Sequence, residues 1–189
     1  MTLKKLFLTC LIILGALSAR AQVTLGSWKI YSPFNNVDFI AGTPDKVYYT
    51  SVGYLFSYDP ETQETYAYTA QNKLSDTGIS SITYNPEKKY LFIAYTNGNV
   101  DLLFDDGKVV NMCDIRDANL TFTKTVNNVS FDDGKIYAAT DFGVVIFDDT
   151  RFVVLESGIY NRKVNSFLRK GDRYLLATGT QVLSVPVSS

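Results

Sequence analysis

The sequence predicts an all-β fold: a β-propeller with about four blades of four-stranded antiparallel sheets, and an incomplete one. Two observations predict this class. Similar segments recur about every 45 residues, and a period of that size is typical of propeller blades. Each segment consists of short runs rich in Val, Ile, Tyr and Phe, bounded by Gly, Asn, Asp and Pro. Outside the N-terminal segment, no stretch of about 12 residues has a convincing helical pattern.

The repeat is clearest where four segments align without gaps. They read KVYYTSVGYLF (46–56), LFIAYTNGNVDL (91–102), IYAATDFGVVIF (136–147) and YLLATGTQVLSV (174–185). One column holds Gly53, Gly98, Gly143 and Gln181, and the column three residues earlier holds Thr50, Tyr95, Thr140 and Thr178. A β-sandwich does not require a fixed period with matching columns, so the alignment favours the propeller.

Each repeat has the same order of parts: an approach strand, a mostly apolar strand, a turn at the aligned column, a third strand and a fourth. In the second repeat we expect strands near 79–84, 90–95, 100–104 and 108–113. The second strands are almost continuously apolar instead of alternating. That pattern indicates a sheet covered on both faces, as a blade is by its neighbours.

The pentapeptide FDDGK occurs at 104–108 and at 131–135, and a near copy, FDDTR, occurs at 147–151. Paired aspartates can bind Ca²⁺, but the alternating oxygen ligands and closing Glu of a calcium loop are missing. The two FDDGK copies also fall at different places in their repeats, whereas a repeated metal site would recur in register. Because Asp-Gly favours tight hairpins, we interpret all three segments as turns.

The fourth repeat is short, because its third strand is expected at 181–187 and the sequence given ends at 189. The segment GSWKIYS (26–32) has strand composition and precedes the first repeat. It could supply the missing strand and close a four-bladed ring. The alternative, which we favour, is a truncated propeller whose open stack would expose strand edges and an apolar blade face.

The N-terminus has the three parts of a secretory signal peptide. A basic start at 4–5 is followed by an apolar run at 6–17 and by an A-x-A pattern at 19–21. The apolar run is too short to span a membrane, which takes about 20 residues. We therefore expect a signal peptide over 1–21, cleaved before Gln22, and no transmembrane segment after cleavage.

The mature chain, 22–189, would form the propeller domain and carry 15 basic and 19 acidic residues, a net charge of about −4. Nucleic-acid binding by bulk electrostatics needs a basic surface, so this balance argues against a nucleic-acid partner. Signal removal leaves Cys113 as the one cysteine, which excludes an internal disulfide. Its apolar neighbours favour a small buried side chain over a reactive thiol.

Catalytic and metal-binding constellations are poorly represented. The chain contains no histidine, which excludes a histidine base, a Ser-His or Cys-His pair and histidine metal ligands. Trp28 is expected to pack at a blade edge. Turn chemistry explains a set of polar and aromatic residues near the aligned column, namely Asn97, Asn99, Asp141 and Phe142. We predict no catalytic, cofactor-binding or metal-binding residue, and no cofactor.

Three long stretches resemble the N-terminal propeller of the PorZ family of Bacteroidetes. They are GSWKIYSPFNNVDFIAGTPDKVYYTSVGYLFSYDPET (26–62), NKLSDTGISSITYNPEKKYLFIAYTNGNVDLL (72–103) and IYAATDFGVVIFD (136–148). The part KLSDTGISSI (73–82) also resembles the wider two-component-regulator propeller repeat, in which a Leu-Ser-Asp step leads into the next blade. The resemblance covers nearly all of the mature chain.

This resemblance implies a role in type IX secretion. PorZ proteins have two propellers and a C-terminal sorting domain, and they belong to a cell-surface attachment complex with the sortase-like PorU, the barrel protein PorV and PorQ. That complex removes the sorting signal from exported cargo and joins the cargo to lipopolysaccharide. The second propeller and the sorting domain do not occur in this sequence, so roles that depend on them are in doubt here.

We therefore expect a non-enzymatic scaffold or binding module, exported to the periplasm or to the outer-membrane cell surface. The alternative is the periplasmic sensor propeller of a two-component regulator that binds glycans. A propeller glycosidase or lyase would need two positioned carboxyl groups, and the sequence singles out no such pair. Neither the ligand, the binding face nor the oligomeric state follows from the sequence.

Overall fold

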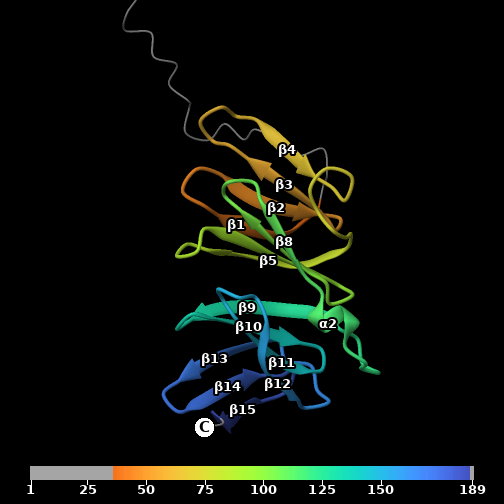
Figure 1. Ribbon diagram of the computed structural model, residues 1–189, viewed down its shortest axis with the longest axis vertical. Helices are drawn as coiled ribbons and strands as arrows, with labels where there is room; N and C mark the ends of the chain where they lie inside the picture. Colours follow the sequence, from red (N-terminus) through yellow and green to blue (C-terminus); the bar gives the residue numbers. More distant parts are fainter. Residues whose placement is uncertain (1–35, 188–189) are drawn as a thin grey trace, which may run out of the picture. The chain divides into compact units, whose positions relative to one another are not determined.

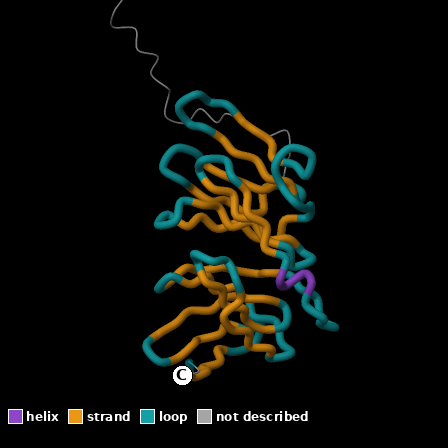
Figure 2. Tube along the Cα trace, viewed as in Figure 1, coloured by secondary structure: helices purple, strands orange, loops and turns teal. Residues whose placement is uncertain are grey.

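The computed structural model describes residues 36–187 (Figure 1). The predicted signal peptide, the segment 26–32 and Trp28 lie outside these residues. Within residues 36–187 the chain is built almost entirely from strands and loops (Figure 2), which confirms the all-β prediction. The one helix within residues 36–187 is α2 (Asp114–Asp117), a single turn between two sheets.

The described strands form four antiparallel sheets, each made from consecutive strands in chain order. Sheet 1 contains β1 (Val37–Gly42), β2 (Val47–Ser51), β3 (Tyr54–Tyr58) and β4 (Thr65–Tyr68). Sheet 2 contains β5 (Ile79–Asn85), β6 (Tyr90–Tyr95), β7 (Val100–Phe104) and β8 (Val109–Met112). Sheet 3 contains β9 (Val126–Asp132), β10 (Lys135–Thr140), β11 (Gly143–Asp148) and β12 (Val154–Ile159). Sheet 4 contains β13 (Ser166–Lys170), β14 (Arg173–Ala177) and β15 (Val182–Pro186).

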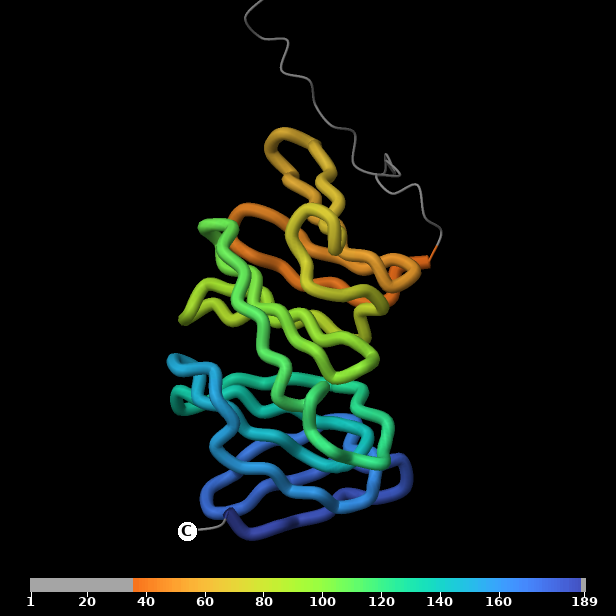
Figure 3. The backbone as a smooth tube through the Cα atoms, turned by 45° about the vertical axis from the view of Figure 1, so that its right-hand side comes forward, coloured from red at the N-terminus to blue at the C-terminus, as the bar shows by residue number. Residues whose placement is uncertain are grey.

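The sheets stack in chain order, as the steady change of colour from one sheet to the next shows (Figure 3). One apolar cluster joins sheets 1 and 2, a second joins sheets 2 and 3, and a third joins sheets 3 and 4. The first strands of neighbouring sheets, β1, β5, β9 and β13, contact one another in that order. Four blades with their first strands side by side make an incomplete propeller, as predicted.

Strand β6 shows why a continuous apolar run forms in such a stack. All six of its residues are buried. Because side chains alternate across a strand, Leu91, Ile93 and Tyr95 enter the cluster with sheet 1. Tyr90, Phe92 and Ala94 enter the cluster with sheet 3. Both faces of the strand are buried, so a polar side chain on either face would lose its contact with water. Apolar residues therefore occupy every position of the strand and do not alternate with polar ones.

The aligned glycine column marks the turn between the second and third strands of each blade. Val52 and Gly53 both have positive φ, as a tight hairpin requires. Gly143 has φ +152°, and a Cβ there would lie 1.9 Å from the carbonyl oxygen of Gly158. The aligned threonines three residues earlier stabilise the same turn. Thr140 Oγ1 donates to Gly143 O and Thr178 Oγ1 donates to Gln181 O, both at 3.0 Å.

The three aspartate-rich segments are turns, as predicted. Residues 104–108 connect β7 to β8, and the Gly107 N–H donates to Phe104 O at 2.9 Å. Residues 131–135 connect β9 to β10, with positive φ at Asp133 and Gly134. In 147–151, the Asp148 side chain accepts the N–H groups of the two residues that follow Asp149. The same pentapeptide occurs in two different turns of the blade because both turns only have to reverse the direction of the chain.

Replacing Gly143 by Ala is expected to lower the free energy of unfolding by more than about 3 kcal/mol, because the added methyl group meets backbone that cannot move aside. The control is Gly42→Ala, at a position with open space around the added Cβ, which should change stability by less than about 1 kcal/mol. Urea unfolding of both variants measures the difference. Equal stabilities would contradict the close approach of Gly143 to β12.

Candidate binding site at the crossover rim

Two kinds of loop separate the strands. The turns between second and third strands and the loops that cross from one sheet to the next lie at the same ends of the strands, since the strands alternate in direction. We call this edge the crossover rim; its segments are 52–53, 69–78, 96–99, 113–125, 141–142, 160–165 and 178–181. It contains the residues near the aligned column that were assigned to turn chemistry, namely Asn97, Asn99, Asp141 and Phe142.

A buried carboxyl group organises this rim at sheet 2. Asp101, on β7, is completely buried. Its Oδ2 accepts the Ser75 N–H at 2.6 Å and the Tyr95 hydroxyl at 2.7 Å, and its Oδ1 accepts Asn111 Nδ2 at 2.9 Å. Burial, followed by this hydrogen bond, raises the pKa of Tyr95 far above its ordinary value. Through Asp101, these hydrogen bonds connect the Leu-Ser-Asp segment (74–76) of the crossover loop to strands β6, β7 and β8.

A second polar group lies beside it. Asn97 Nδ2 donates to Asp76 Oδ2 at 2.7 Å, and Asn99 Nδ2 reaches the same oxygen at 3.4 Å. The amide of Asn97 is the main cause that lowers the pKa of Asp76. In the equivalent turn of sheet 3, Asp141 accepts hydrogen bonds from Thr123 and Asn127. Contacts between the turns and the crossover loops bring these residues together. Most of their polar side-chain atoms form hydrogen bonds within the chain.

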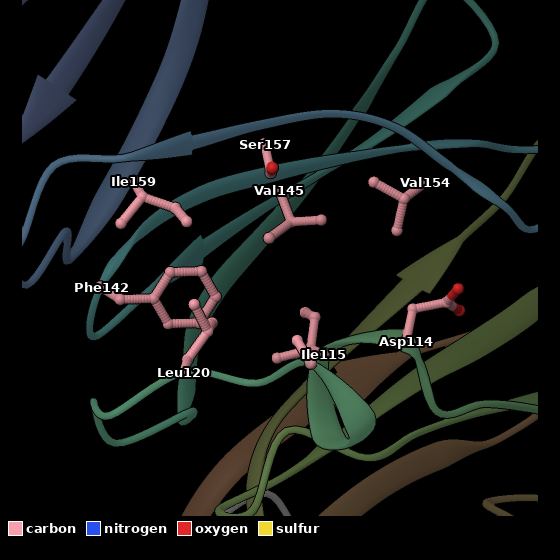
Figure 4. A pocket seen from close by; sticks show the side chains of 9 residues that line it. Asp114, Ile115, Leu120, Phe142, Val145, Val154, Ser157 and Ile159 are labelled. Atoms are coloured by element: carbon pink, nitrogen blue, oxygen red, sulfur yellow. The ribbon is translucent and has the colours of Figure 1, made fainter.

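An apolar pocket lies where the α2 segment faces the outer part of sheet 3 (Figure 4). Its volume is about 130 Å³. The α2 segment supplies Asp114, Ile115, Ala118 and Leu120, and sheet 3 with its turn supplies Phe142, Val145, Val154, Ser157 and Ile159. In Figure 4 the two groups of side chains face each other across the pocket, and the Asp114 carboxyl group lies at one end. The pocket is therefore suited to an apolar group.

The sequence did not predict this pocket. Helix α2 has four residues, which is too short for a helical period to be recognised. Phe142 was assigned to turn chemistry, and its side chain is in fact buried in the cluster between sheets 2 and 3. Close contact between Gly98 and the loop 113–125 places α2 here, because a Cβ on Gly98 would lie 2.7 Å from Ile115 Cγ2.

Asp149 is a buried residue on the opposite rim that sequence reasoning also missed. Its carboxyl group accepts the hydroxyl of Tyr90 and, at 3.0 Å, Nδ2 of Asn85, both from sheet 2. Burial, then this hydrogen bond, raises the pKa of Tyr90. A pocket of about 210 Å³ opens beside Asp149 and is lined partly by Asp132 and Asp133. Within residues 36–187, no group of three or more His, Cys, Asp or Glu side chains could hold a metal ion.

Cys113 is half-buried instead of fully buried, which corrects the prediction of a buried side chain. It directly precedes α2, so part of its surface faces solvent. A hydrogen bond to Asp117 is the main cause that raises the pKa of its thiol. A raised pKa disfavours the thiolate, which is the nucleophilic form of the side chain.

Comparison with protein families identifies the fold. The model of the PorZ N-terminal beta-propeller domain of the type IX secretion system matches residues 47–188. The chain belongs to this family. A solved structure of PorZ from Porphyromonas gingivalis, described as an essential bacterial surface component of the type-IX secretion system, is 28% identical, with a TM-score of 0.72. That match covers 80% of this chain and 20% of the PorZ chain.

Two further structures share the fold with the PorZ family domain. The extracellular domain of a putative one component system of B. thetaiotaomicron is 14% identical, with a TM-score of 0.68, and the match covers 83% of this chain and 22% of that one. The extracellular domain of a putative hybrid two component system of the same organism is 16% identical, with a TM-score of 0.63 and coverages of 85% and 23%. No curated protein matches the chain.

The chain thus spans about a fifth of the length of these solved structures. The family assignment fixes the blades as those of a PorZ N-terminal propeller. Among residues 36–187, no helix is both long and apolar enough to cross a membrane. The polar network around Asp101 and the pocket beside α2 are features of the crossover rim of this PorZ family propeller.

Replacing Tyr95 by Phe is expected to reduce the free energy of unfolding by about 2 kcal/mol, because Asp101 loses a hydrogen bond in a fully buried site. The matched control is Tyr49→Phe. The Tyr49 hydroxyl is buried and has no hydrogen-bond partner among the described residues, so its removal should be neutral or slightly stabilising. Thermal unfolding of the two variants is the measurement. A larger loss from Tyr49→Phe would contradict the role given to Asp101.

The lowered pKa of Asp76 predicts a pH effect on stability. A carboxyl group with a lowered folded-state pKa stabilises the fold fully above its unfolded-state pKa, and this contribution disappears as the pH falls through the folded-state value. The stability difference between the unmodified chain and Asp76→Asn should be constant from about pH 7 to pH 5 and shrink below about pH 4. Urea unfolding across this range measures it; a difference that grows on acidification would show the sign to be wrong.

Proposed function

We propose that the chain is a non-enzymatic binding module of the cell envelope that works in the attachment complex of type IX secretion. The observation that carries this proposal is the PorZ family match over residues 47–188. The same machinery is named for the PorZ structure that is 28% identical to the chain. The partners are the sortase-like PorU, the barrel protein PorV and PorQ, with lipopolysaccharide as a further ligand.

The chemistry of the rim supports binding over catalysis. Asp101 is enclosed by hydrogen-bond donors of its own chain, so it is not aimed at an open cavity as a catalytic acid or base would be. On the opposite rim, Asp149 borders a pocket, but its carboxyl group is held by Tyr90 and Asn85. The pocket beside α2 is lined mainly by aliphatic side chains, with Phe142 at one end. Such a surface recognises a partner by shape and apolar contact.

We propose further that residues 1–21 are a signal peptide and that 22–189 is the exported propeller domain. An exported location fits a family whose solved member is described as a bacterial surface component. Protein recovered from the cell envelope should begin at Gln22, because cleavage follows the A-x-A pattern. N-terminal sequencing is the test, and a mature chain that still carries residues 4–17 would contradict the proposal.

The secretion role is tested by removing the blades from the bacterium that encodes the chain. An in-frame deletion of 47–188 should leave exported cargo with its sorting signal uncleaved and without lipopolysaccharide, as judged by cargo mass. Restoring the intact chain should restore processing. The matched control restores Val182→Thr, an exposed substitution on β15 that should behave as the intact chain does. Normal cargo processing in the deletion strain would overturn the proposed role.

A further inference from the structure

Strand β12 is an edge strand with an unusual surface. Its outer side pairs with no strand among residues 36–187. Large apolar side chains are exposed along and beside it: Val153 by 44%, Leu155 by 44% and Ile159 by 49%. Proteins commonly protect such edges with Lys, Pro or a covering segment. β12 reads VLESGI, which contains one charged residue and no Lys or Pro.

The corresponding outer strand of sheet 2 does not share this surface. The apolar residues of β8, Val109 and Val110, are half-buried and pack against the clusters with sheets 1 and 3. The apolar surface of β8 is therefore packed against neighbouring sheets. The apolar surface of β12 is therefore more exposed than that of β8, its counterpart in sheet 2.

The pocket beside α2 opens along the same strand, since Val154, Ser157 and Ile159 of β12 form one of its walls (Figure 4). Its volume of about 130 Å³ is close to the roughly 150 Å³ of an apolar cavity that accepts benzene. One aliphatic side chain or one aromatic ring would fill it. An edge strand and an apolar pocket that share three residues can be engaged together by one ligand in an extended conformation.

Charge beside the pocket selects among such ligands. Arg116 pairs with Asp117, Arg151 pairs with Asp148, and Lys124 Nζ donates to the carbonyl oxygens of Arg116 and Ala118. Asp114 is exposed, makes no ion pair within residues 36–187 and is the one ionisable residue among those that line the pocket. Its carboxylate favours a ligand with a cationic group next to its apolar group.

We propose that β12 and the pocket beside α2 together dock an extended peptide segment of a partner protein. The peptide adds as a strand to the outer side of β12, inserts one apolar side chain into the pocket and places a Lys or Arg near Asp114. Main-chain hydrogen bonds give such added strands affinity, and the pocket gives specificity. A bulge in the β11–β12 pairing lies next to Leu155, so the strand addition is confined to about 156–160.

This proposal goes beyond the secretion role and holds for any envelope machinery in which the domain serves. It names a surface and a ligand class, and both can be tested on the full chain in solution without secretion. The probe is an acetylated, amidated heptapeptide, Lys-Thr-Val-Leu-Val-Thr-Lys, whose central Leu is the anchor. Binding is followed by NMR shifts of the β12 amides and of the Ile159 and Val154 methyl groups.

We expect the probe to bind with a dissociation constant below about 1 mM and to shift these resonances selectively. The same peptide with both valines N-methylated cannot complete the strand hydrogen bonds and should bind at least about tenfold more weakly. Replacing its central Leu by Asp should weaken binding at least as much, because a carboxyl group would enter an apolar pocket near Asp114.

Three variants of the chain test whether the peptide binds at β12 and the pocket beside α2. Ser157→Phe fills the pocket from β12 and should abolish the shifts, and Asp114→Asn should weaken binding about threefold and reduce its salt dependence. Val182→Thr changes an exposed apolar residue on another edge strand, β15, and should bind as the unmodified chain does. Two-dimensional spectra without peptide show that each variant is folded.

Several results would overturn the proposal. Equal binding of the N-methylated peptide would mean apolar adhesion without strand addition. Shifts confined to β15, or no shift at the highest soluble peptide concentration, would place the site elsewhere or nowhere. Concentration-dependent broadening of β12 without peptide would show that a second copy of the chain occupies the strand.

Discussion

Burial of every blade on two faces is the constraint on which the structure depends. A sheet such as sheet 2 has no solvated face, so its fold is stable only while both neighbours remain in place. Each large buried side chain of β6, such as Leu91, Phe92 or Ile93, contributes about 2 kcal/mol while the neighbouring sheet that covers it stays in place. Stability is therefore shared between neighbouring blades, as in other repeat architectures.

Apolar contact fixes the distance between blades but not their register. Polar contacts from an inner strand to the next inner strand, or to the loop that leads into it, supply that register. Ser80 Oγ on β5 donates to Val126 O, the first residue of β9, at 3.1 Å. Asn127 Nδ2 on β9 donates in the same way to Val164 O at 3.0 Å. Both donors sit where the pairing with the next strand shifts by one residue. The bulge turns each side chain out of its own sheet toward the following blade.

The sequence was sufficient for the parts of the fold that local chemistry decides. The strands of sheet 2 begin and end within a residue of their predicted bounds, because turn residues and apolar runs fix both. The aligned segments FDDGK and FDDTR show where this stops. Asp106 is exposed and caps the Lys108 N–H, whereas Asp149, in the same column, is buried against Tyr90 and Asn85. The two positions differ because residues of the neighbouring blade surround Asp149. The sequence around either aspartate does not show which blade residues will lie next to it.

The crossover rim is the most variable part of the described blades. The strands have similar lengths in every blade, while the crossover loops 69–78, 113–125 and 160–165 differ in length and sequence. The stack tolerates this variation because each crossover loop supplies few buried side chains to the apolar clusters, such as Leu74, Ile115 and Val164, and most members come from the strands. The longest of these loops carries α2 and packs against the outer part of sheet 3, leaving the pocket between them. The repeat therefore provides the scaffold, and its least repetitive segment provides the most distinctive surface.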